Sequence, residues 1–138
     1  KPVFVISTAN NIDLLPLEII RKGRFDEIFF LDLPKTKERE EIFKIHLQEF
    51  RPDSWKSFDY SKLAKLSESF SGAEIKQSII EGMYHAFYEE REFTTEDICL
   101  ALKELIPLAN LENNQMIKLQ NWASSGQIRL ASSQHLYI

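Results

Sequence analysis

Cysteine is almost absent from this chain of 138 residues, which contains only Cys99. A single cysteine cannot form an intramolecular disulfide, so the sequence excludes a disulfide-stabilised secreted scaffold and indicates a reducing compartment. Cys99 lies within the apolar run at residues 98–102, where we expect a buried structural thiol rather than a reactive one.

Long apolar runs are also absent. No stretch approaches the roughly 20 residues that a membrane-spanning helix requires, and the apolar run at residues 3–6 is too short for a signal peptide. We therefore expect no membrane insertion. Because the chain begins with Lys1 and enters an apolar run at once, we expect the natural protein to extend upstream.

Positive charge is in slight deficit, with 17 Lys and Arg against 21 Asp and Glu and a net charge of -4. This balance disfavours sequence-independent nucleic-acid binding, which usually needs a basic face. The composition is 43% hydrophobic and 28% charged, as expected for a globular chain with a real core.

Two short apolar runs, residues 3–6 and 28–33, are rich in β-branched and aromatic side chains, a pattern typical of buried parallel strands. Helix-like spacing at residues 14–21 could supply the crossover between them. Since two strands cannot form a stable open sheet, we expect their partners upstream.

After Pro34 the pattern predicts amphipathic helices. We expect them over residues 36–50, 59–69, 71–90, 95–106 and 112–124. Thr36 is the predicted cap of the first, and its less polar side is predicted at Ile42, Phe43, Ile45, His46, Leu47 and Phe50.

The helix over residues 71–90 has the clearest signals. Ser71 and Glu74 fit a capping box, in which each side chain satisfies a free amide of the first turn. The residues that recur every four positions predict one buried stripe: Ile75, Ile79, Met83 and Phe87.

The residues with catalytic potential precede the helices. Asn10 follows the first predicted strand, where ligands of open α/β sheets bind, and a side-chain amide there can orient a water against a phosphate. Arg21 and Arg24 flank Gly23 and can present two guanidinium groups to a polyphosphate. Alternatively, Asn10 is a turn former and the arginines belong to a surface loop paired with nearby carboxylates.

Residues 5–15 (VISTANNIDLL) and 20–26 (IRKGRFD) together resemble the second region of homology of AAA ATPases. By that resemblance, Asn10 is the first sensor, and Arg21 and Arg24 are arginine fingers that reach into the nucleotide site of a neighbouring subunit. The resemblance implies an oligomeric ring, with a hexamer as the expected form.

The resemblance extends into the helices. Residues 39–46 (REEIFKIH) are similar to the family helix that packs on adenine and ribose, which implies nucleotide contacts for Ile42 and His46. Residues 71–75 (SGAEI) resemble the second-sensor segment of the classical AAA clade, which implies nucleotide contacts for Gly72 and Ala73. Otherwise, Ile42 is simply a core residue and His46 a partly buried surface histidine.

The resemblance implies that the full-length protein hydrolyses ATP with Mg²⁺. This chain has no Gly-x-x-x-x-Gly-Lys-Thr/Ser loop for the phosphates and no apolar run ending in paired acids for the metal. We therefore expect the chain alone to be inactive, with the magnesium ligands elsewhere in the protein.

The fold class implied is α/β: the carboxyl-terminal part of a P-loop parallel sheet subdomain at residues 1–34, then an all-α helical lid at 35–107 and a helical extension at 108–138. Residues 105–109, 119–123 and 129–132 resemble a plastid and cyanobacterial AAA family known as a hypothetical chloroplast open reading frame. This resemblance implies a chloroplast stroma or a cyanobacterial cytoplasm.

Two other classes compete with a motor that remodels a macromolecular client. One is a non-enzymatic module whose helical bundle binds a protein or nucleic acid. The other is a clamp-loader or initiator type of AAA protein, which would have an arginine near residues 72–74, where none occurs. Without a His-Glu-x-x-His motif, the sequence offers no evidence for a metalloprotease branch.

Overall fold

The computed structural model describes residues 2–9, 12–16, 18, 25–111, 113–125 and 128–131. The chain divides into two compact units. One consists of Lys1–Asp32 together with Ile117–Ile138, and the other of Leu33–Met116.

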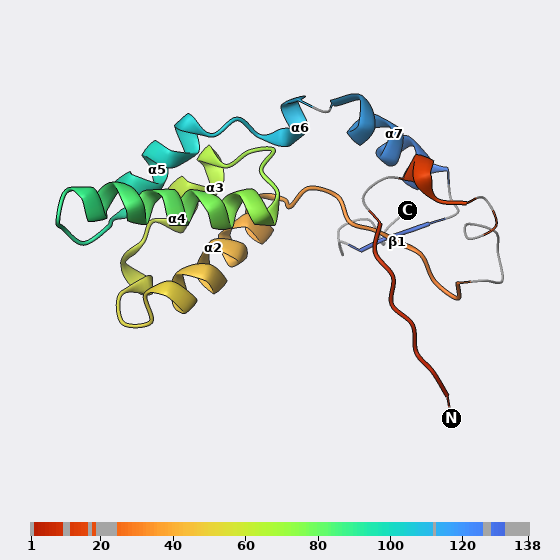
Figure 1. Cartoon of the computed structure of the whole chain (residues 1–138), viewed down its shortest axis with the longest axis horizontal. Helices are drawn as coiled ribbons and strands as arrows, with labels where there is room; N and C mark the ends of the chain where they lie inside the picture. Colours follow the sequence, from red (N-terminus) through yellow and green to blue (C-terminus); the bar gives the residue numbers. More distant parts are fainter. Residues whose placement is uncertain are drawn as a thin grey trace. The chain divides into compact units, whose positions relative to one another are not determined.

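The unit Leu33–Met116 is a helical bundle, in which four helices pack around one core (Figure 1). These are α2 (Thr36–Phe50), α3 (Tyr60–Leu66), α4 (Gly72–Tyr88) and α5 (Thr95–Glu104). A 3-10 turn at Trp55–Ser57 and the short α6 (Leu108–Leu111) complete it, and α7 (Asn113–Ser124) follows. The helices predicted after Pro34 are confirmed, with ends shifted by a few residues, while α6 was not predicted. Of the helix predicted over residues 14–21, residues 17 and 19–21 lie outside the described residues.

Helix α2 begins one residue earlier than predicted, because Thr36 is not its cap. Lys35 is the N-cap, and its backbone N–H donates to the Glu38 carboxylate at 2.7 Å. Thr36 instead lies in the first turn, where its hydroxyl accepts a 3.3 Å hydrogen bond from Arg39. Ile45, predicted on the less polar side of this helix, is 60% exposed.

The core of the bundle follows the helical period. Its largest fully buried apolar side chains are Phe43, Leu47, Leu63, Ile75, Ile79 and Ile98. Cys99 is also buried, as predicted, and burial raises the pKa of its thiol.

The predicted stripe on α4 is wrong at its end, where Phe87 is 76% exposed. A strict four-residue repeat drifts by about 40° per step around a helix of 3.6 residues per turn. The buried face therefore continues from Ile79 to Gly82 and Ala86, which lie against the core side of the helix.

The unit formed by the chain's two end segments contains a short parallel ladder. Strand β1 (Phe29–Phe30) pairs with β2 (Arg129–Leu130), with Phe29 opposite Arg129. The predicted strand over residues 28–33 is thus confirmed only at its centre, and its partner is a segment that the sequence did not indicate.

The predicted strand over residues 3–6 is not found, because residues 2–9 form neither helix nor strand. Their apolar side chains stay exposed, from 67% at Val5 to 89% at Phe4. An apolar run becomes a strand only where a neighbouring strand pairs with its backbone, and no described segment does so here. The described residues therefore support the helical part of the fold class, and not the sheet subdomain.

Candidate functional site

The three residues predicted to act in catalysis, Asn10, Arg21 and Arg24, lie outside the described residues. The nearby Glu27, one of the carboxylates that could pair with these arginines, forms an ion pair with Arg129 at 3.2 Å.

The four residues predicted to contact the nucleotide lie on two neighbouring helices of the bundle. Ile42 and His46 are one turn apart on α2, and Gly72 and Ala73 form the first turn of α4. Ile42 is partly buried against the core, whereas Ala73 is exposed.

Ile42 and Gly72 are brought together by the packing of α2 on α4. A Cβ atom placed on Gly72 would lie 3.8 Å from Ile42 Cδ1, which is ordinary van der Waals contact. The glycine therefore leaves the space of a side chain open beside Ile42.

His46 is partly buried, with a side chain 21% exposed. Its Nδ1 atom is buried and makes no hydrogen bond to the described residues, since the Glu49 carboxylate lies 3.6 Å away. A polar atom without a partner is a candidate for hydrogen bonding to a ligand.

The start of α4 is built by the predicted capping box, which the structure confirms. The Ser71 hydroxyl and amide donate to the Glu74 carboxylate at 2.5 and 2.8 Å, and the Glu74 amide donates back to Ser71 Oγ at 3.4 Å. Among the described residues, the amides of Gly72 and Ala73 find no hydrogen-bond acceptor. Two donors therefore remain available at this helix end.

Glu74 also makes a long-range contact that the sequence did not signal. Its Oε1 accepts a 2.7 Å hydrogen bond from the Leu108 amide at the start of α6. Burial alone would raise the pKa of Glu74, but the hydrogen bonds from Ser71 and Leu108 outweigh it and lower the pKa. The carboxylate thus stays ionised beside Gly72 and Ala73.

The described part of the chain contains no group of three or more His, Cys, Asp or Glu side chains that could hold a metal ion. Nor does any helix in that part combine the length and the apolar composition needed to cross a membrane.

No protein-family model matches the chain. All 138 residues align at 78% identity with the "Uncharacterized AAA domain-containing protein ycf46" of Trieres chinensis, of which they cover 28%. The protein of the same name from Gracilaria tenuistipitata var. liui is 58% identical over 132 residues, which are 96% of this chain and 27% of that protein.

A more distant relative is the proteasome-activating nucleotidase of Sulfurisphaera tokodaii, 34% identical over 113 residues, which are 81% of this chain and 28% of that protein. The chain thus spans 27% to 28% of the length of these relatives. The predicted resemblance to AAA-type ATPases, and among them to the plastid ycf46 family, is therefore confirmed.

Proposed function

We propose that this chain supplies the first sensor, the arginine fingers and the helical lid of a ring-forming AAA motor that hydrolyses ATP and remodels a macromolecular client. The identity to AAA proteins supports this assignment, over the whole chain for the relative from Trieres chinensis and over 81% of it for the proteasome-activating nucleotidase. We assign residues 1–34 to the nucleotide-binding subdomain, 35–107 to the lid and 108–138 to a helical extension. The names of the algal relatives support a plastid location.

The observation that carries the proposal is the convergence of Ile42 and Gly72, 3.8 Å apart when a Cβ is placed on the glycine. These residues come from two segments whose nucleotide contacts were inferred separately. Their proximity supports one surface for the nucleotide, with the Gly72 and Ala73 amides as donors and His46 at one side.

The charge of this surface indicates which part of ATP meets it. A helix amino terminus favours an anion, but here the ionised Glu74 carboxylate already occupies the end of α4. The triphosphate would be repelled, whereas adenine or ribose would not. The lid therefore contacts the base and sugar, and the phosphates are bound elsewhere.

In the proposed reaction, Asn10 orients the attacking water, and Arg21 and Arg24 stabilise the charge that spreads over the transferring phosphoryl group of a neighbouring subunit. Magnesium would neutralise charge on the phosphates, and the residues that would hold it lie outside this chain. Such an arginine contributes ~10³ to 10⁵ in rate. Because Arg21 and Arg24 complete a site of another subunit, a six-membered ring is the active form. The chain alone is inactive, because its sequence has no phosphate-binding loop and no apolar run ending in paired acids.

The test uses the full-length protein with Arg24→Ala. We expect turnover to fall at least ~10³-fold while a fluorescent ATP analogue still binds, because the lost charge acts on the transition state. Normal turnover would contradict the finger assignment.

Two further variants test the lid surface. Gly72→Val fills the space beside Ile42 and should weaken analogue binding, whereas Gly72→Ala, which makes only ordinary contact there, should weaken it less.

Mixing wild-type subunits with the Arg24→Ala variant should lower activity more than linearly, and simple linear dilution would count against a coupled ring.

A further inference from the structure

Three exposed aromatic side chains gather at the carboxyl end of α4. Tyr84 is 57% exposed, Phe87 76% and Tyr88 85%, although aromatic side chains usually bury most of their surface. We call these three residues the aromatic tip. None of the three belongs to the hydrophobic core of the bundle.

The aromatic tip borders a depression in the protein surface. The depression has a volume of about 700 Å³ and is open to solvent; its lining residues are Phe87, Tyr88, Glu90, Arg91 and Glu92. Ligand sites commonly have volumes of about 300–1,000 Å³, so the depression has room for side chains of a partner.

The backbone beside the aromatic tip is held by a helix-ending motif. The Arg91 amide donates to the Ala86 carbonyl and the Glu90 amide to the Phe87 carbonyl, both at 3.1 Å, which is the pattern of a Schellman motif. Glu90 occupies the left-handed position, with φ of 52°, where glycine is usual. The turn therefore has a defined shape, although its sequence lacks glycine.

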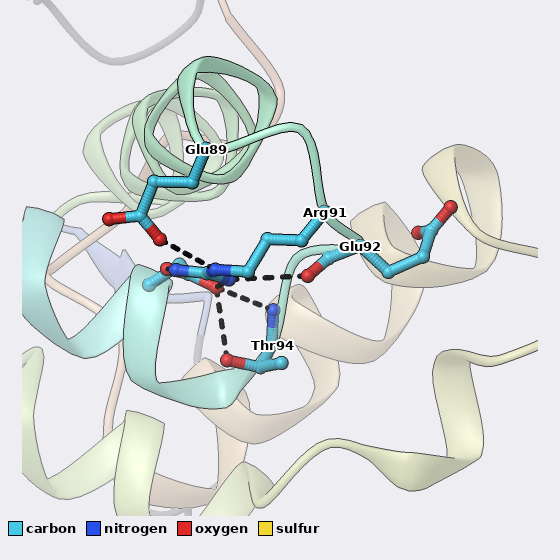
Figure 2. Close-up of polar contacts among 5 residues, drawn as sticks. Glu89, Arg91, Glu92 and Thr94 are labelled. Atoms are coloured by element: carbon cyan, nitrogen blue, oxygen red, sulfur yellow. Dashed lines mark hydrogen bonds and ion pairs between the residues drawn. The ribbon is translucent and has the colours of Figure 1, made fainter.

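The Arg91 side chain fixes the same turn to the start of α5. Its guanidinium donates two hydrogen bonds to the Asp97 carboxylate, at 2.7 and 2.6 Å, and one to Glu89 at 2.6 Å. Figure 2 shows this side chain extending from the turn between Glu89 and the residues near Thr94. A surface held in this way loses little conformational freedom when it binds a partner.

The turn is acidic, since residues 81–97 contain six carboxylates and one arginine. Arg91 pairs with Asp97 and Glu89, and two cations from outside the turn, Arg51 and Lys62, pair with Glu92 and Glu96. Glu90 is exposed and forms no ion pair with any described residue. The surface around the aromatic tip therefore attracts cations and repels polyanions such as nucleic acids.

We propose that the aromatic tip and Glu90 form a docking site for an arginine-bearing segment of a second protein. A guanidinium group stacks on aromatic faces and also pairs with carboxylates, so both features of the surface favour the same ligand chemistry. Contiguous exposed apolar surface rimmed by charge is characteristic of protein interaction sites. The site does not involve the nucleotide-contacting residues, and the inference does not depend on the proposed function.

The test measures the binding of a fluorescently labelled arginine- and leucine-containing peptide to the full chain by anisotropy. Wild type should bind this peptide and not its analogue with glutamate in place of arginine. The double variant Phe87→Ser with Tyr88→Ser should bind about tenfold more weakly, since two exposed cation–π contacts contribute about 0.5–1 kcal/mol each. Glu90→Lys should remove much of the dependence of peptide binding on salt concentration.

The matched control is Ile45→Ser, which removes an exposed apolar side chain from α2 and should leave binding unchanged. Unchanged circular dichroism spectra establish that the variants fold. Equal binding by the wild type and the double variant, or equal binding of the glutamate peptide, would overturn the proposal. Self-association of the wild type that the double variant loses would overturn the proposal, and would show instead that the aromatic tip is an interface between two copies of this chain.

Discussion

A buried arginine holds the first helix of the bundle in place. Arg39 is only 7% exposed, and its guanidinium donates to the Ala64 carbonyl at 2.9 and 3.0 Å and to the Pro34 carbonyl at 2.7 Å. It therefore ties the start of α2 to the chain before it and to α3. Burying a charge is costly unless its donors are satisfied, and here carbonyl oxygens satisfy them.

We expect Arg39→Ala to destabilise the chain by about 2–3 kcal/mol, because hydrogen bonds from a charged group are lost and the Ala64 carbonyl loses its donor. Urea unfolding followed by circular dichroism measures the change. Lys37→Ala, at an exposed position in the same helix, should change stability by less than about 0.5 kcal/mol. Equal effects of the two substitutions would contradict the role of Arg39.

Asp97 makes the stability of the bundle depend on pH. Hydrogen bonds from Arg91, and then from Thr94, lower its pKa to about 2, although burial opposes the shift. An unfolded aspartate titrates near pH ~3.9. Since the folded pKa is the lower of the two, the contribution is fully present above about pH 4 and is lost as the pH falls towards 2.

We therefore expect the free energy of unfolding to fall by about 1–2 kcal/mol through Asp97 between about pH 5 and pH 2, after allowance for solvent screening. Denaturant unfolding at several pH values in this window measures the slope. Asp97→Asn should be less stable than wild type at neutral pH and should show a smaller slope, and an unchanged slope would assign the pH dependence to other carboxylates.

Helices α4 and α5 approach each other closely at Gly82. A Cβ atom on this glycine would lie 3.0 Å from the Ile98 nitrogen and 3.1 Å from the Asp97 carbonyl carbon. Both are backbone atoms, which cannot move as a flexible side chain can. The absence of a side chain at Gly82 thus sets the distance between the two helices.

We expect Gly82→Ala to destabilise the bundle by about 1–3 kcal/mol through this overlap, despite the higher helix propensity of alanine, worth about 1 kcal/mol. Gly72→Ala is the matched control, because its Cβ meets only Ile42 Cδ1 at 3.8 Å. Thermal unfolding of both variants measures the difference. If the two were equally stable, the close approach at Gly82 would not limit the packing.

The sequence predicted those elements whose signals are local. The capping box of Ser71 and Glu74 and the helical period at Ile75 and Ile79 act within one or two turns, so they can be interpreted without a fold. The exposure of Phe87 was mispredicted because a four-residue repeat was extended past the point where the buried face moves to Gly82.

Long-range contacts could not be predicted in the same way. The bond from the Leu108 amide to Glu74 joins residues 34 positions apart, and β1 pairs with a strand about 100 residues later. Nothing in the local sequence identifies such partners. The candidate nucleotide surface was predicted residue by residue through resemblance, and only the structure places Ile42 beside Gly72.

The two units of the chain differ in the interactions that stabilise them. The core cluster of buried side chains lies entirely in Leu33–Met116. In the described part of the other unit, the ladder is two residues long, and the apolar side chains from Val3 to Ile6 are exposed. A two-stranded ladder is at best marginally stable in water.

We therefore expect residues 33–116, expressed alone, to unfold cooperatively with a midpoint within a few degrees of that of the full chain, because the stabilising core is retained. Circular dichroism against temperature measures both midpoints. Phe43→Ala in the excised unit should lower its stability by about 3–5 kcal/mol, since Phe43 is completely buried. An excised unit without a cooperative transition would show that the end segments, and not only the helical core, stabilise the bundle.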